Sequence, residues 1–166
     1  MERRELFGSL FSPFKGEKKE KKDVVVRPPY FQSEDSFYKG CFECTDTPCI
    51  TFCEENIIVI KEDKTPVLDF KLGGCTYCDE CAKVCPNDVL KVEYKKSINV
   101  KVEIDIMRCM SWHQTMCFSC KDPCLDDAID FLGMFRPSID GEKCTNCGFC
   151  IGVCPSDAIV IKEKEL

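Results

Sequence analysis

The sequence is poor in the residues and motifs on which most enzymes depend. It has a single histidine, His113, and contains neither a Gly-rich phosphate loop nor a dinucleotide-binding fingerprint. No combination of nucleophile, base and orienting group indicates a catalytic centre. We therefore predict that the chain is not an enzyme.

Long apolar runs are also missing. No stretch approaches the roughly 18 apolar residues that indicate a transmembrane helix. Residues 5–14, ELFGSLFSPF, are a broken apolar stretch that continues directly into the charged KGEKKEKKD, without the apolar core or cleavage site of a secretory signal. We expect a cytoplasmic protein without a transmembrane segment, in which residues 5–14 pack on the body, bind a partner or touch a membrane surface.

Basic residues are outnumbered by acidic ones. The chain has 23 Lys and Arg against 29 Asp and Glu, which gives a formal net charge of −6. An acidic chain is a poor ligand for a phosphate backbone, so we do not expect nucleic acid as a partner. Partners with basic docking faces are favoured instead.

Cysteine, in contrast, is abundant after residue 40. The chain has 16 cysteines in 166 residues, and none of them lies in its first 40 residues. In a secreted chain this density would indicate a disulfide framework. A cytoplasmic chain keeps its thiols reduced, and there clusters of cysteine indicate metal sites.

The cysteines fall into four groups of four that repeat along the chain. The second and fourth groups share the spacing C-x2-C-x2-C-x3-C-P, whereas the first is C-x2-C-x4-C-x3-C and the third is C-x7-C-x2-C-x3-C. In chain order the groups are Cys41, Cys44, Cys49 and Cys53; Cys75, Cys78, Cys81 and Cys85; Cys109, Cys117, Cys120 and Cys124; and Cys144, Cys147, Cys150 and Cys154.

The compact spacing favours cubane clusters over zinc, which usually takes two separate C-x2-C pairs. Three thiolates on one tight loop suit three corners of a cubane, and this run is the bacterial ferredoxin signature, whose fourth cysteine ligates the other cluster. We therefore predict four [4Fe–4S] clusters with exchanged fourth ligands. The predicted sets are Cys41, Cys44, Cys49 and Cys85; Cys53, Cys75, Cys78 and Cys81; Cys109, Cys117, Cys120 and Cys154; and Cys124, Cys144, Cys147 and Cys150.

The first and third groups are less regular than the other two. The insertion TDTP separates Cys44 from Cys49, and MSWHQTM, which includes His113, separates Cys109 from Cys117. An insertion lengthens a loop but leaves the ligands present. The alternatives are a vestigial or labile site, which would leave three clusters, and a His113 that is either an exposed loop residue or a group that acts at the cluster.

The sequence after each fourth cysteine repeats as well: CEENIIVI, CPNDVLKV, CLDDAIDF and CPSDAIVI. Each tail predicts a turn with a polar side chain, followed by a short strand. Strands that end in an aspartate precede the third and fourth groups. Each unit is thus expected to run strand, cysteine loop, short helical turn, turn and strand. The polar turn residues are Asn56, Asp88, Asp127 and Asp157.

We therefore predict a small, loop-rich α+β fold of two tandem bacterial 2[4Fe–4S] ferredoxin-like modules, 41–104 and 105–166. Residues 1–40 are expected to form an extended, partly flexible N-terminal arm, because Pro28 and Pro29 enforce an extended path. Its aromatic residues are expected to cover the first cluster, to lie against a partner or to pack on the body. They are Tyr30, Phe31, Phe37 and Tyr38.

Three segments carry a family resemblance: RPPYFQSEDSFYKGC, CMSWHQTMCFSCKDPC and CTNCGFCIGVCPSDAI. Together they resemble the NapF family, the ferredoxin-type accessory proteins of the periplasmic nitrate reductase system, although the first cysteine group is wider than is usual there. The resemblance implies one-electron transfer to the reductase catalytic subunit, or maturation of its iron–sulfur cluster, in the cytoplasm before export. A general electron carrier, or a wiring subunit of a membrane-associated redox complex, is the alternative.

Overall fold

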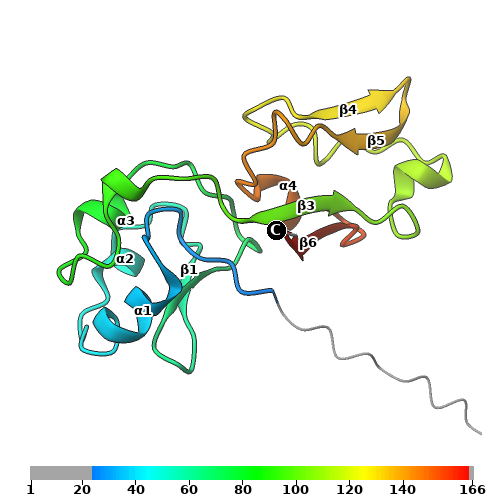
Figure 1. Ribbon diagram of the computed structural model, residues 1–166. Helices are drawn as coiled ribbons and strands as arrows, with labels where there is room; N and C mark the ends of the chain where they lie inside the picture. Colours follow the sequence, from blue (N-terminus) through cyan, green and yellow to red (C-terminus); the bar gives the residue numbers. More distant parts are fainter. Residues whose placement is uncertain (1–23, 165–166) are drawn as a thin grey trace, which may run out of the picture.

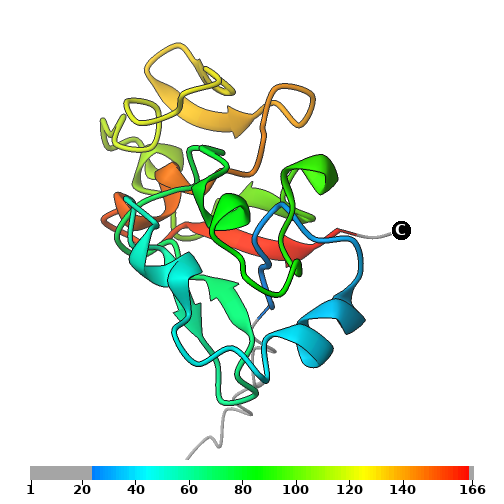
Figure 2. The same cartoon turned by 90° about the vertical axis from the view of Figure 1, so that its left-hand side faces the viewer.

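The computed structural model describes residues 24–164. The predictions for residues 5–14 and for the charged stretch that follows them lie outside these residues. The helices α1, α2 and α3 lie at one end of the molecule, and the strands β3 to β6 lie with α4 at the other (Figure 1). Figure 2 looks onto the end that carries α1, α2 and α3, with β3 and β6 behind it.

The helices are short. The longest within residues 24–164, α1, has Glu34 and Asp35 in its first turn and Lys39 in its last, which suits the helix dipole. A four-residue helical turn lies within the first, second and fourth cysteine groups as predicted, whereas the third group has a 3₁₀ turn. The helices are α1 Glu34–Gly40, α2 Pro48–Thr51, α3 Glu80–Lys83 and α4 Phe149–Gly152, and the 3₁₀ turns are η1 Val92–Tyr94 and η2 Met110–His113.

The strands of residues 24–164 form three antiparallel pairs. Strands follow the first, third and fourth cysteine groups as predicted. The prediction of a strand after the second group is wrong, because Leu90 makes only an isolated bridge and the chain then enters η1. The pairs are β1 Ile58–Ile60 with β2 Pro66–Leu68, β3 Val100–Ile104 with β6 Ile159–Glu163, and β4 Ile129–Leu132 with β5 Phe135–Ile139.

The isolated bridge joins Leu90 to Phe31, far earlier in the chain. Leu90 lies five residues after a fourth cysteine, as Ile159 does, and Ile159 pairs with Ile104. Phe31 therefore occupies, in the half of the molecule with α1 to α3, the pairing position that Ile104 occupies in the half with β3 to β6. Pro29 precedes this bridge and has no N–H to donate, which limits the pairing to a short contact.

The turns after the four groups have a common backbone geometry. Their polar residues lie in the left-handed region, with φ of 53°, 56°, 46° and 48° in chain order. Asn and Asp adopt this conformation more readily than other residues with a side chain. The predicted turns are therefore confirmed, and backbone conformation supplies a further reason for their polar residues: Asn56, Asp88, Asp127 and Asp157.

The aromatic residues before the first cysteine are largely part of the core. Tyr30, Phe31 and Phe37 are buried, and the Phe31 and Phe37 rings lie 5.0 Å apart. Tyr38 is exposed. Of the alternatives for this segment, packing on the body is therefore the one that describes Tyr30, Phe31 and Phe37.

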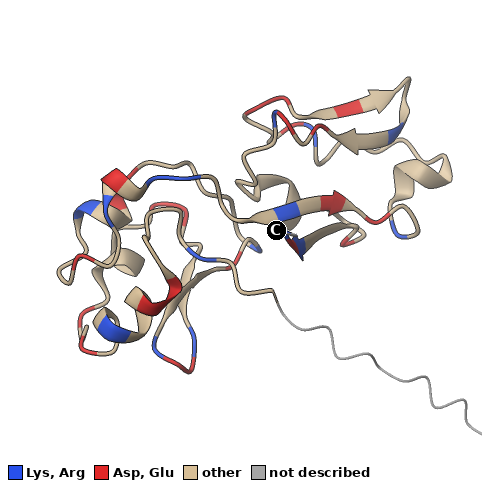
Figure 3. Cartoon of the chain, viewed as in Figure 1, with Lys and Arg blue, Asp and Glu red and all other residues tan. Residues whose placement is uncertain are grey.

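Charged residues of both signs are interspersed over the two parts of the molecule (Figure 3). On β3 and β6, for example, Glu103 pairs with both Lys101 and Lys162. None of the helices in the described residues is long and apolar enough to span a bilayer.

Candidate metal centre

The first site consists of the thiols of Cys41, Cys44, Cys49 and Cys85, which line one cavity. Three of them belong to the first cysteine group, and Cys85 comes from the second. Burial, with a smaller contribution from the neighbouring thiols of Cys85, Cys49 and Cys44, raises the pKa of Cys41 to about 11. The wide spacing of the first group therefore still brings three of its thiols to a shared cavity.

The second site consists of Cys53, Cys75, Cys78 and Cys81, which line another cavity. Its fourth member, Cys53, comes from the first group. Cys78 is exposed, whereas Cys81 is buried and its pKa is raised to about 12, chiefly by burial. This site therefore combines apolar cover with access to solvent at one thiol.

The third site consists of Cys109, Cys117, Cys120 and Cys154. Burial, with a smaller contribution from the nearby thiols of Cys109, Cys117 and Cys154, raises the pKa of Cys120 to about 11. Three cysteines of the widened third group thus meet the last cysteine of the fourth group.

The fourth site consists of Cys124, Cys144, Cys147 and Cys150, which line a cavity with Ile129 and Ile139. Burial, with a smaller contribution from the thiols of Cys147 and Cys144, raises the pKa of Cys150 to about 12. In all four sites, three cysteines of one group meet the fourth cysteine of the neighbouring group. Their role as iron ligands stays a prediction.

Backbone N–H groups point at several of the exchanged fourth cysteines. Ala158 N–H donates to Cys154 Sγ at 3.2 Å, and Ala128 N–H donates to Cys124 Sγ at 3.3 Å. Burial raises the pKa of Cys154, but backbone donors that include Ser156 and Ala158 outweigh it and lower the pKa below its usual value. The turn after the fourth group therefore stabilises the thiolate of Cys154.

The arrangement of the thiols fits a multinuclear centre. At the first, second and fourth sites four thiols line one cavity, which suits an iron–sulfur core with cysteine thiolates as ligands. The hydroxyl of Ser111, two residues after Cys109, is buried and has no partner among the described residues, so it is available to donate to sulfur.

Comparison with known proteins agrees with this donor set. The family model for the 4Fe-4S binding domain matches residues 137–160, which include the fourth cysteine group. The ferredoxin-type protein NapF of Escherichia coli K12 is 30% identical over 138 residues, which cover 81% of this chain and 82% of the relative. This chain belongs to the NapF family of ferredoxin-type proteins.

Two further relatives extend the comparison. NapF of Haemophilus influenzae is 29% identical over 146 residues, which cover 86% of this chain and 81% of the relative. The ferredoxin-type protein NapG of Escherichia coli K12 is 26% identical and covers 86% of this chain and 71% of the relative. The chain is thus an iron–sulfur electron-transfer protein with [4Fe–4S] clusters.

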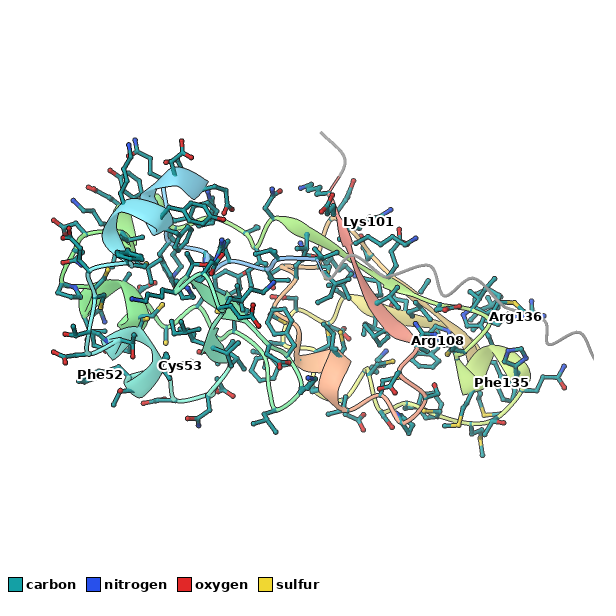
Figure 4. The ribbon with its side chains drawn as sticks, turned by 90° about the horizontal axis from the view of Figure 1, so that it is seen from below. Phe52, Cys53, Lys101, Arg108, Phe135 and Arg136 are labelled. Carbon is teal, nitrogen blue, oxygen red and sulfur yellow. The ribbon has the colours of Figure 1, made fainter. Side chains whose placement is uncertain are left out.

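The widened third loop of this NapF-family chain is anchored to β5. Trp112 Nε1 donates to the carbonyl oxygen of Pro137 at 3.1 Å, and Arg136 lies 5.9 Å from the centre of the Trp112 ring. His113 is exposed, and its Nε2 lies 3.1 Å from the carbonyl oxygen of Met107. The labelled Arg136 lies beside the loop, at the opposite end of the molecule from Cys53 (Figure 4).

Sequence reasoning missed the role of Tyr30 in this NapF-family site. The alternatives for the arm aromatics include cover of the first cluster but not of the second, whereas Tyr30 lines the cavity of the second site. Its hydroxyl accepts a hydrogen bond from Asp79 N–H at 3.1 Å, beside Cys78. Nothing in the cysteine spacing indicates this contact, because it depends on the path of the preceding segment across the fold.

Proposed function

We propose that this NapF-family protein holds four [4Fe–4S] clusters, one at each of the sites defined above, in two tandem ferredoxin-like modules with an N-terminal arm. The exchange of the fourth cysteine between neighbouring groups is the observation that carries the proposal. It is the ligand arrangement of bacterial two-cluster ferredoxins. The bridge between Phe31 and Leu90 supports a first module that recruits part of the arm.

The protein's own residues prepare the sites for a cluster. At the second site Tyr30, Ile57 and Leu68 supply apolar cover that limits water. At Cys154, backbone N–H donors favour the thiolate, which is the form that binds iron. When bound, [4Fe–4S] clusters supply one-electron transfer.

We further propose that the protein is not an enzyme and serves the catalytic subunit of the periplasmic nitrate reductase in the cytoplasm before export. There it would transfer single electrons or mature an iron–sulfur cluster. Membership of the NapF family supports this assignment. A general electron carrier or wiring subunit is the second candidate, and a direct contact between cysteines of different sites, Cys75 and Cys147, favours it.

The cluster content is tested by an anaerobic count of iron and acid-labile sulfide, with EPR spectra of the reduced protein. We expect about sixteen irons per chain, since each cubane holds four. A count of about twelve irons would mean that one cluster is absent, and the first and third sites would then be examined individually. Stoichiometric zinc in place of iron would overturn the proposal.

The partner is tested by anaerobic capture of the reductase catalytic subunit on the full-length protein, in the oxidised and the reduced state. We expect a complex in at least one state. Absence of a complex in both states would overturn the maturation role. A fully matured reductase that has lost electron supply in cells without this protein would favour the wiring role.

A further inference from the structure

Two cysteines of different sites are joined directly through the backbone. Cys75 N–H donates to the carbonyl oxygen of Cys147 at 2.7 Å, across 72 positions of the chain. Cys75 belongs to the second site and Cys147 to the fourth. The contact therefore lies between the two halves of the molecule.

Tyr77 adds hydrogen bonds at the junction between the halves, which is the region around the contact of Cys75 with Cys147. Its hydroxyl donates to the carbonyl oxygen of Thr145 at 2.6 Å and accepts from Ile98 N–H at 3.2 Å. Asn146 Nδ2 donates in turn to the carbonyl oxygen of Ile98 at 3.2 Å. Two of these hydrogen bonds, from Tyr77 to Thr145 and from Asn146 to Ile98, therefore hold the loop of the fourth group against residues that precede β3.

Glycines allow the two halves to approach closely. A Cβ atom at Gly148 would lie 2.3 Å from the ring of Phe70, and one at Gly74 would lie 2.5 Å from the ring of Phe149. At Gly152 it would lie 2.5 Å from the carbonyl oxygen of Lys71. These are distances that real Cβ atoms do not adopt, so side chains at these positions would push the junction apart.

Within each half, the two sites are also neighbours. Helix α2, which carries Cys49 of the first site, packs against α3, which carries Cys81 of the second. In the other half, the Cys120 thiol of the third site lies close enough to Cys150 of the fourth site to help raise the pKa of Cys150. The second and fourth sites therefore lie on the inner side of their halves, next to the junction.

We propose that the four sites form one electron path in the order first, second, fourth, third, and that electrons cross between the halves at the contact of Cys75 with Cys147. The proposal rests on the proposed cluster content. The spatial order differs from the order of the groups along the chain. In the crossing step one electron leaves the centre held by one site, which is oxidised, and reduces the centre held by the other; no proton or further reactant takes part.

Gly148→Ala tests the path, with Gly133→Ala as the matched control. Both glycines have positive φ, 89° and 65°, so alanine strains the backbone at each of them. Nothing lies within 4 Å of a Cβ at Gly133, whereas Phe70 blocks one at Gly148. Only the first substitution should therefore open the junction.

The readout is pulsed dipolar EPR of the fully reduced full-length protein, which measures the separations between paramagnetic clusters. The native protein and Gly133→Ala should show three short separations, two within the halves and one across the junction. Gly148→Ala should retain its iron and the two separations within the halves, and should lengthen the separation across the junction. If Gly148→Ala loses iron, the same measurement is made on Tyr77→Phe, which removes only the bridging hydroxyl. The separation across the junction should then lengthen in Tyr77→Phe.

A native protein with only two short separations, or a third separation unchanged in the variant that retains its iron, would overturn the path. Neither result would affect the cluster count, so the path and the proposed function fail independently. Conversely, iron well below sixteen per native chain would count against the proposed function before the path is measured.

Discussion

The buried guanidinium of Arg27 donates a hydrogen bond to the hydroxyl of Thr65, 2.6 Å away, and so ties the segment before the first cysteine to the β1–β2 hairpin. The same nitrogen donates to the carbonyl oxygen of Pro66 at 2.9 Å, and Nε pairs with Glu34 at 3.0 Å. The guanidinium carbon lies 4.7 Å from the centre of the Phe37 ring. Arg27 therefore connects three parts of this half of the molecule.

Arg27→Ala should destabilise the half that holds the first and second sites. It removes several hydrogen bonds and leaves buried acceptors unpaired, at a cost of about 2–4 kcal/mol. The measurement is the guanidinium midpoint of the cluster absorbance under anaerobic conditions. Lys39→Ala, an exposed position in the last turn of α1, should cost less than about 1 kcal/mol. Equal shifts in the two variants would contradict the structural role of Arg27.

Exchange of the fourth cysteines predicts which substitutions act alike. Cys85→Ser should abolish the same EPR signal as Cys49→Ser, because both thiols line the first site although they belong to different groups. Cys81→Ser, in the same group as Cys85, should instead abolish the signal of the second site. If Cys85→Ser and Cys81→Ser removed one common signal, each group would serve its own cluster and the exchange would be refuted.

The lowered pKa of Asp63 should make the free energy of unfolding depend on pH. Hydrogen bonds from the Thr65 hydroxyl at 2.6 Å and the Thr65 N–H at 3.0 Å hold the pKa of Asp63 below its usual range. Because the folded-state pKa is depressed, the stabilisation is present above the unfolded pKa of about 4 and is lost as the pH falls through the folded value.

The test compares the native protein with Asp63→Asn over the acidic range, so that the acid lability of the clusters affects both proteins alike. The difference in unfolding midpoint should be largest near neutral pH and should disappear at the lowest pH at which clusters persist. Asp122→Asn, at an exposed position, should show no such trend. A difference that grew as the pH fell would contradict the sign of the shift.

Local patterns predicted much of this molecule because they act over a few residues. The cysteine spacing fixes which three thiols share a loop, and an Asn or Asp three residues after a fourth cysteine marks a left-handed turn. Contacts between distant segments could not be predicted in this way. The bridge of Phe31 with Leu90 and the hydrogen bond of Cys75 to Cys147 depend on how whole segments pack, and no repeat or spacing encodes them.

The left-handed turns themselves give a last prediction, at Asp157. Its φ is 48°, its N–H donates to the carbonyl oxygen of Cys154 at 3.2 Å, and the next N–H donates to Cys154 Sγ. Asp157→Val should cost about 1–2 kcal/mol, because a β-branched residue is strained at positive φ. Asp157→Gly has no such strain and should stay within about 1 kcal/mol of the native protein.

The strain should weaken the third site before the others, because this turn holds Cys154, a member of the third site. Asp157→Val should therefore lose the EPR signal of one cluster at lower guanidinium concentration than the other signals, while Asp157→Gly should not. Asp130→Val is the matched control, since it lies at an exposed position of β4, where β-branched residues are favoured. If Asp130→Val released the same cluster as readily, the loss would come from the change of side-chain type and not from the backbone geometry of the turn.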